Sequence, residues 1–401
     1  MKKSIKHYFV KNSSKTIWRY FAFTFFVNLH FFSAVLVPIY TNWAHISKFQ
    51  ILILQSWFML WIFILEVPTG VVADYFGRKY SLAMGALVVT FGALIYGSVP
   101  SYPVFLLGEF LFAAAFSFMS GADDALLYDA LKEEGREGEI KHLAGKAHAI
   151  QLIAMLISAP IGGIMASIFG VNAPMLFCAI PFFIAAVIAW NIKEPILKDK
   201  VSESKRYMII LKTGLNFFYH HRVLRLIALD AVIVAAAAYF VIWLYQPLLQ
   251  SLGIPLIYFG LLHAVMALTE VLIAANFVRL EKLFGGAKQY LRFSALITSF
   301  MFFVVALIPN IITVMLFVVL AGGFGLTRLE LMTAYMNKLI PSGQKATILS
   351  SISMLRRLVL VFLNPLVGFI ADKTLSGALL FIGIIPIVVF FFSPIEQEMF
   401  D

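Results

Sequence analysis

The sequence has few charged residues and almost no cysteine. Only 13% of its 401 residues are Asp, Glu, Lys or Arg, about half the share of an ordinary soluble domain. Hydrophobic residues make up 61% of the chain and include 40 Phe. A soluble domain could not bury that much apolar surface, so the sequence predicts a protein surrounded by lipid. The single cysteine, Cys178, lies in an apolar run and excludes an internal disulfide.

Sequence motifs for catalysis are also missing. There is no phosphate-binding loop, no cluster with metal-ligand spacing and no arrangement typical of an activated nucleophile. We therefore expect a protein that is not an enzyme, holds no cofactor and no metal, and is not driven by ATP.

Long apolar runs recur along the whole chain. Because isolated backbone polar groups cannot face lipid, single runs of this length indicate membrane-spanning helices. The sequence predicts an all-α polytopic membrane protein with twelve transmembrane helices, at 20–40, 49–73, 80–97, 104–128, 147–169, 173–192, 226–249, 255–278, 291–308, 311–337, 346–371 and 377–393. The basic segment 1–19 resembles a signal peptide, but the run after it is long enough to span and lacks a small-x-small cleavage site, so we interpret it as a retained first helix.

Lys and Arg are concentrated in alternate connecting segments. The loops on one side contain basic residues throughout, whereas those on the other side hold only Lys48 and Lys373. This asymmetry predicts that the basic loops and both termini are cytoplasmic, in the plasma membrane of a bacterium. It also explains the net charge of +10 without a nucleic-acid partner, since no single basic groove is formed.

The longest connecting segment, 193–225, divides the chain into two predicted six-helix bundles, 1–192 and 226–401. Three short segments of the first half recur in the second at a nearly constant offset: Leu65–Gly70 with Thr269–Ala274, Ser158–Ala166 with Leu363–Ala371, and Asp124–Ala130 with Arg328–Ala334. Duplicated halves of this kind place a substrate site between them, near the middle of the membrane.

The segment GVVADYFGRK resembles the loop 2–3 signature of the major facilitator superfamily. The matching positions are Gly70, Asp74, Gly77, Arg78 and Lys79, and Tyr75 replaces an expected basic residue. The resemblance implies two pseudo-symmetric six-helix bundles, a cavity lined by helices 1, 4, 7 and 10, and a gating role for this cluster against helix 11. The simpler alternative is that Asp74 caps a helix end and pairs with Arg78.

Several acids lie inside the predicted helices. Glu66 is roughly 12 Å deeper than Asp74 along a helix, and Glu270 is its counterpart in the second half. An acid at that depth is costly unless it faces a cavity or a partner, so it is a functional candidate by default. The alternative is a carboxyl that is hydrogen-bonded to a neighbouring helix. Candidate proton carriers are Glu66, Asp123, Asp124 and Glu270.

Asp124 and Arg328 occupy corresponding positions in the two halves. We hypothesise that they pair across the cavity and close its cytoplasmic side in the outward-facing state. Alternatively, each pairs within its own half, Arg328 with Glu330. Further cavity or gate candidates are Glu109, Asp230, Arg356, Arg357, Asn28, His30, Tyr239, Trp243 and Gln246.

These observations predict a secondary transporter that works by alternating access. We favour proton-coupled export of a small amphipathic organic molecule by a monomer in the lipid bilayer. Uptake or facilitated diffusion of a metabolite or siderophore by the same fold is the first alternative. A transporter-like receptor or assembly factor is the second.

Overall fold

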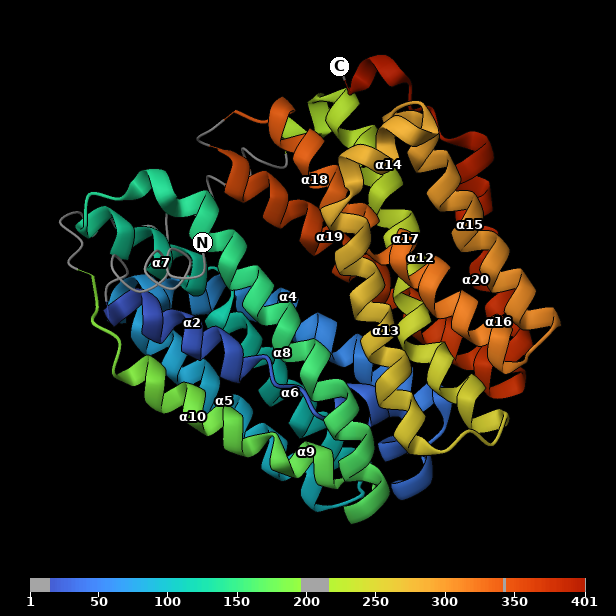
Figure 1. Cartoon of the computed structure of the whole chain (residues 1–401), viewed down its shortest axis with the longest axis horizontal. Helices are drawn as coiled ribbons and strands as arrows, with labels where there is room; N and C mark the ends of the chain where they lie inside the picture. The colour runs from blue at the N-terminus through green and yellow to red at the C-terminus, as the bar shows by residue number, and fades with distance from the viewer. Residues whose placement is uncertain (1–14, 196–215, 342–343, 401) are drawn as a thin grey trace, which may run out of the picture.

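The computed structural model of the chain describes residues 15–195, 216–341 and 344–400. All regular structure in these ranges is helical. Eleven helices within them are long and apolar enough to cross a membrane. Together with a broken first segment, they agree with the predicted twelve-helix membrane fold (Figure 1).

The first half contains five of the long spans. They are formed by α4 (Lys48–Phe76), α5 (Arg78–Ser98), α6 (Tyr102–Met119) with α7 (Ala122–Glu133), α8 (Ile140–Phe169), and α9 (Ala173–Phe177) with α10 (Ala179–Trp190).

The second half contains the other six. They are α12 (Arg222–Ser251), α13 (Leu256–Ala275), α15 (Ala287–Leu307), the composite of α16 (Ile311–Leu316), η4 (Phe317–Gly322), α17 (Gly323–Leu326) and α18 (Arg328–Leu339), then α19 (Lys345–Lys373) and α20 (Leu375–Phe392). The short helix α14 (Phe277–Phe284) connects α13 and α15.

The first membrane segment is not the continuous helix expected at 20–40. Helix α2 (Lys15–Val27) ends in the middle of the run, and η1 (Ser33–Val35), α3 (Leu36–Pro38) and the π-helix η2 (Ile39–Trp43) follow. Polar side chains occupy the break: Asn28 Nδ2 donates to the carbonyl of Thr24, and Ser33 Oγ donates to that of His30. Broken helices of this kind are tolerated at membrane depth only where protein or a cavity surrounds them.

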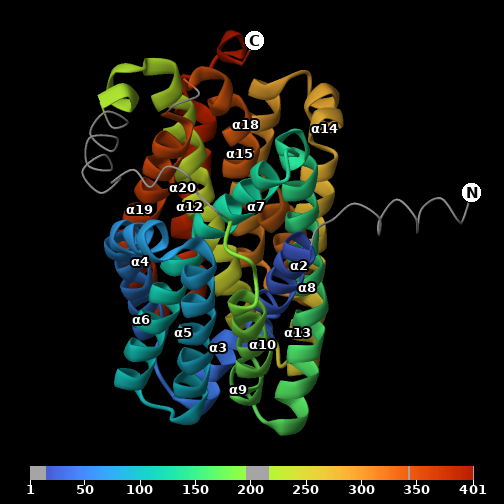
Figure 2. The same ribbon diagram turned by 90° about the vertical axis from the view of Figure 1, so that its left-hand side faces the viewer.

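The two ends of the bundle differ in charge. One end, here called the basic end, carries α7, α14 and α18 (Figures 1 and 2) with Lys132, Lys282 and Lys338. The opposite end, here called the closed end, carries the turns at 99–101, 170–172, 252–255 and 308–310.

The two halves are joined by hydrogen bonds at the closed end. Gln246 on α12 accepts from Val37 N at 3.0 Å and donates to Ser33 O at 3.1 Å, so it joins the broken first segment to the second half. One turn later, Gln250 Nε2 donates to Thr41 and Asn42. The carboxylate of Asp372 accepts from Lys48 N at 2.7 Å and caps the start of α4.

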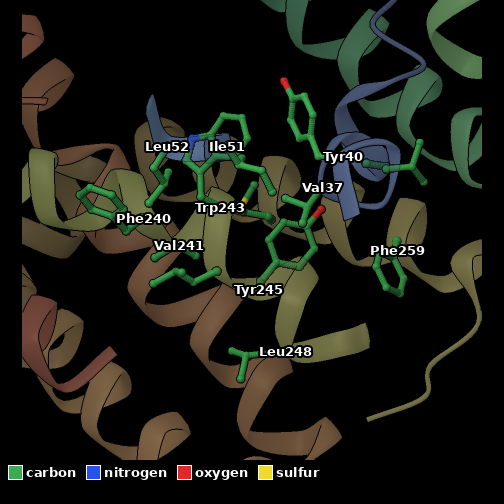
Figure 3. Close-up of a cluster of buried hydrophobic side chains, with 14 of the residues drawn as sticks. Val37, Tyr40, Ile51, Leu52, Phe240, Val241, Trp243, Tyr245, Leu248 and Phe259 are labelled. Atoms are coloured by element: carbon green, nitrogen blue, oxygen red, sulfur yellow. The ribbon is translucent and has the colours of Figure 1, made fainter. Parts of the chain in front are cut away.

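Apolar packing reinforces the same end. Val37, Leu52, Trp243, Tyr245 and Leu248 come from both halves and belong to one buried cluster (Figure 3). Helices α8 and α13 also approach closely, because a Cβ added at Gly260 would lie 2.3 Å from the carbonyl oxygen of Ala159. Small residues allow such backbone contact between membrane helices.

Candidate functional site

A cavity of about 730 Å³ lies between the break in the first segment and the basic end, lined by the first half and by Arg357 of the second half. Its size lies in the range of pockets that hold small organic ligands. Polar residues on its wall are Thr24, Asn28, His30, Ser120, Asp123, Asp124, His148, Gln151 and Arg357. Aromatic residues on its wall are Tyr20, Phe23, Phe32, Phe112, Phe116 and Phe182. The combination is suited to an amphipathic molecule.

Two helix interruptions shape this cavity. The first is the break at 28–32, which brings Asn28 and His30 to the wall. The second separates α6 from α7, where Gly121 adopts a left-handed conformation with φ 76°. Interrupted helices present backbone ends and first-turn side chains to a ligand site in many transporters.

Asp123 and Asp124 lie in the first turn of α7, and both line the cavity. Asp123 Oδ1 accepts from the backbone N of Asp124 at 2.8 Å. No ion pair to either carboxylate is found in the described part of the chain. The cavity therefore presents two acids that are available to a proton or to a cationic group.

Several wall residues escaped the sequence analysis. His148, Gln151 and Met155 of α8 line the cavity. Their i, i+3, i+7 spacing puts them on one helix face, and a polar stripe in an otherwise apolar helix was the available signal. The phenylalanines offered no such signal, because 40 of them are spread along the chain.

Glu66 does not line this cavity but connects the two halves. Its carboxylate forms an ion pair with Arg357 on α19, and its Oε1 accepts from Ser350 Oγ at 3.0 Å. Arg357 itself is on the cavity wall. The sequence analysis named both residues separately, and the resemblance implied that the motif cluster lies against helix 11. The partner of Arg357 is Glu66, on the same helix as Asp74.

The loop 2–3 motif forms a turn at the basic end. Helix α4 ends at Phe76, and Gly77 has φ 111°, which favours glycine. Arg78 pairs with Asp129 of α7 at 2.9 Å. The carboxylate of Glu194, which follows α10, accepts from the backbone N of Arg78 and of Lys79 at 2.7 and 2.9 Å. Its negative charge there interacts favourably with the positive end of the helix dipole of α5. The side chain of Asp74 lies outside the described part, and nothing packs within 4 Å of Gly70 where a Cβ would lie.

Arg328 does not face Asp124 in this structure, whereas the pair between them was hypothesised for the outward-facing state. Arg328 is 1% exposed and forms an ion pair with Asp230 inside the second half. It also donates to the carbonyl of Leu291 at 2.6 Å and to Ser294 Oγ. The physical reason is that a fully buried guanidinium needs a charge and several acceptors around it. Its partner within the half is Asp230 and not Glu330.

The other candidates divide between the closed end and the second half. Trp243 and Gln246 are buried at the closed end, and neither they nor Tyr239 line the cavity. Glu109 is also buried away from it. Glu270 lies close enough to Glu330 for their charges to repel, and Glu330 interacts with Arg356.

Comparison with known proteins agrees with this architecture. The model of the Major Facilitator Superfamily matches residues 20–364. An uncharacterized MFS-type transporter of Methanocaldococcus jannaschii is 26% identical over 172 residues, which are 43% of this chain and 44% of that protein. The chain thus matches less than half the length of this relative.

Solved structures show the same fold over almost the whole chain. A variant of the nucleoside transporter NupG superposes with a TM-score of 0.81 at 12% identity, covering 96% of this chain and 100% of that one. A D-xylose–proton symporter superposes with a TM-score of 0.73 at 10% identity, covering 96% and 98%. The chain therefore belongs to the major facilitator superfamily, a family of membrane transporters and not of enzymes.

Proposed function

We propose that the protein is a secondary transporter that exports a small amphipathic organic cation in exchange for protons. The observation that carries this proposal is the cavity of about 730 Å³, with its aromatic wall and the two carboxylates of Asp123 and Asp124. Aromatic faces and a carboxylate together favour an organic cation. Because these acids have no cationic partner in the described ranges, protonation and binding of a cation compete for them.

The direction of transport rests on the charge asymmetry. Lys and Arg are concentrated at the basic end, which the positive-inside rule assigns to the cytoplasm of a bacterial plasma membrane. The halves are joined at the closed end, whereas the cavity lies toward the basic end. An exported molecule would enter the cavity in this conformation.

The contacts between the halves indicate which residues would rearrange during transport. The pair of Glu66 with Arg357 and the motif turn at Gly77, Arg78 and Lys79 lie nearer the basic end. Glu66 is a candidate for sensing protonation, because loss of its charge would release Arg357 toward the cavity. Glu270 is the corresponding candidate in the second half.

A second candidate is proton-coupled uptake of a polar metabolite. The solved structures with similar folds include a D-xylose–proton symporter and a nucleoside transporter. In the same fold, the cavity would then release its substrate at the basic end. The aromatic wall argues for the amphipathic cation.

The test begins with thermal unfolding of the purified protein against aromatic cations, nucleosides, pentoses and dipeptides, since a ligand of the folded form raises its apparent stability. Transport of ethidium is then measured in inside-out vesicles with an imposed proton gradient. We expect stabilisation by aromatic cations and uncoupler-sensitive accumulation of ethidium, both lost in Asp123→Asn with Asp124→Asn. Stabilisation by nucleosides or pentoses alone would favour the uptake candidate.

A further inference from the structure

Glu109 on α6 lies at the centre of a buried polar cluster in the first half. It is 6% exposed. Its Oε1 lies within hydrogen-bond distance of Tyr96 Oη at 2.8 Å, of Gln55 Nε2 at 2.9 Å and of Tyr40 Oη at 3.0 Å. These three groups come from α5, α4 and the π-helix η2, so one carboxyl oxygen joins four elements. The two tyrosine hydroxyls are also within hydrogen-bond distance of each other.

Counting hydrogens shows which form of the carboxyl completes this cluster. Three oxygens, those of Tyr40, Tyr96 and Glu109, form a triangle with three contacts. Each contact needs one hydrogen, and each tyrosine supplies only one. The third hydrogen must come from the carboxyl group. A protonated Glu109 therefore lets every oxygen of the triangle donate once and accept once, while Gln55 donates to it from outside.

Among the described residues, no cation pairs with a carboxylate at this position. The groups that face Glu109 from the packed elements are Tyr40, Gln55 and Tyr96, with Tyr239 of α12 near enough to interact with its charge. Tyr239 in turn interacts with the cationic side chain of Arg356. Within the described ranges, Glu109 makes no ion pair. A buried charge without a counter-charge is costly, which favours the neutral acid.

This cluster is separated from the cavity by one aromatic layer. Phe112 lines the cavity, and its ring packs against Tyr96 with the centroids 6.0 Å apart. Phe32, another wall residue, contacts Phe112 edge to face at 5.6 Å. Glu109 is thus distinct from the acids Asp123 and Asp124 that the substrate would meet.

The polar cluster around Glu109 is connected through Tyr40 to the hydrogen bonds that join the two halves at the closed end. Tyr40 lies in the π-helix of the broken first segment, and the next two residues, Thr41 and Asn42, accept from Gln250 of the second half. On the preceding turn, Val37 N donates to Gln246. One side of this segment is therefore held by Glu109 and the other by α12. π-helical turns often mark functional positions.

We propose that Glu109 is a proton-binding site that locks the closed end, so that protonated Glu109 stabilises the structure seen here and its ionisation favours opening of the closed end. The proposal rests on the proposed transport function and adds a second proton site outside the substrate cavity. The sign follows from linkage: if the closed form binds the proton more tightly, a lower pH shifts the population toward it. Opening would hydrate Glu109 and allow it to exchange its proton with the solution at that end.

Infrared difference spectroscopy tests proton binding without any substrate. Purified protein in lipid is taken from high to low pH, and the C=O stretch of a newly protonated carboxylic acid is recorded. We expect a band that is lost in Glu109→Gln and retained in Glu137→Gln, whose acid lies in the exposed 134–139 turn. In Tyr40→Phe the band moves to higher frequency, because a hydrogen bond to the carboxyl is removed. A spectrum unchanged in both Glu109→Gln and Tyr40→Phe would overturn the assignment.

Cysteine labelling tests the lock. Ala371 on α19 is 1% exposed at the closed end, whereas Ser98 at the end of α5 is exposed. The readout is the ratio of the labelling rate of Ala371→Cys to that of Ser98→Cys. Taking this ratio corrects for the effect of pH on thiol reactivity. The unmodified chain, whose Cys178 is buried, provides the background.

We expect this ratio to rise several-fold with pH and to become low and independent of pH in Glu109→Gln, which imitates the protonated acid. A ratio that still depends on pH in Glu109→Gln would overturn the lock. Tyr96→Phe provides a second variant if Glu109→Gln does not fold, and its pH response should also change. If ethidium is not transported while the infrared band and labelling behave as expected, the proposed export of an organic cation is wrong and the proton site at Glu109 stands.

Discussion

Glu66 on α4 and Arg357 on α19 form an ion pair that crosses the boundary between the two halves. Ser350 on α19 donates to the same carboxylate, and Arg357 also lines the cavity. A single arginine thus contacts the candidate substrate space and the acid that joins the halves. A ligand or proton that changes either partner would change the contact between α4 and α19.

The first prediction concerns the strength of this pair. Both side chains are less than one-fifth exposed, at 17% and 18%, so the pair should stabilise the fold by about 1 kcal/mol. The measurement is a double-mutant cycle on thermal unfolding in detergent, with Glu66→Gln, Arg357→Gln and the double variant. Additive effects of the two single changes would mean that the pair does not act as a unit.

The second prediction concerns Gln246 at the closed end. Gln246→Leu removes the acceptor of Val37 N and the donor to Ser33 O, which leaves buried backbone groups unpaired. We expect the closed end to be weaker by about 1.4 kcal/mol, and labelling of a cysteine at Ala371 to become about tenfold faster. Gln289→Leu, at an exposed position of α15, is the matched control. Equal rates in the two variants would contradict a role of Gln246 in closure.

The third prediction separates a structural from a gating role for Arg328. Asp230→Asn leaves a fully buried guanidinium without its counter-charge and should lower the free energy of unfolding by about 3–5 kcal/mol. Glu330→Gln, on the same helix as Arg328 but exposed, should change it little. If Glu330→Gln were the more damaging change, the pairing within the second half would be misassigned.

The membrane fold was predictable because its signals are long and repetitive. Apolar runs identified all the spans, and the motif Gly77-Arg78-Lys79 identified the turn between α4 and α5. The break in the first segment was not predicted, because Asn28 and Ser33 interrupt it without a proline or glycine between them. Their hydrogen bonds to Thr24 and His30 show the cause only once the chain is folded.

The partners of the charged residues could not be read from the sequence. Glu66 and Arg357 are far apart in the chain, as are Arg78 and Glu194, so nothing local indicates their contact. The repeat offset suggested a symmetric pair between Asp124 and Arg328, but equivalent positions need not face each other. In this structure Arg328 is enclosed by the second half while Asp124 reaches the cavity, so the two side chains do not meet.

The fourth prediction concerns the close contact between α8 and the broken segment. A Cβ added at Gly162 would lie 1.7 Å from the carbonyl oxygen of Phe31, so Gly162→Ala must push the two backbones apart. We expect a loss of about 1–3 kcal/mol in the free energy of unfolding. Gly145→Ala on the same helix is the control, because nothing lies within 4 Å of the added Cβ there. Alanine is the better helix former, so this control should be neutral or slightly stabilising.

Thermal unfolding of the two variants in the same detergent measures the difference. A similar loss in both would mean that the break at residues 28–32 does not pack against α8 as the structure shows. A loss confined to Gly162→Ala would show that this glycine is required because the segment next to it approaches with its backbone. A smaller side chain at Phe31 should then not rescue Gly162→Ala, because the atom that collides with the added Cβ is the backbone carbonyl oxygen of Phe31.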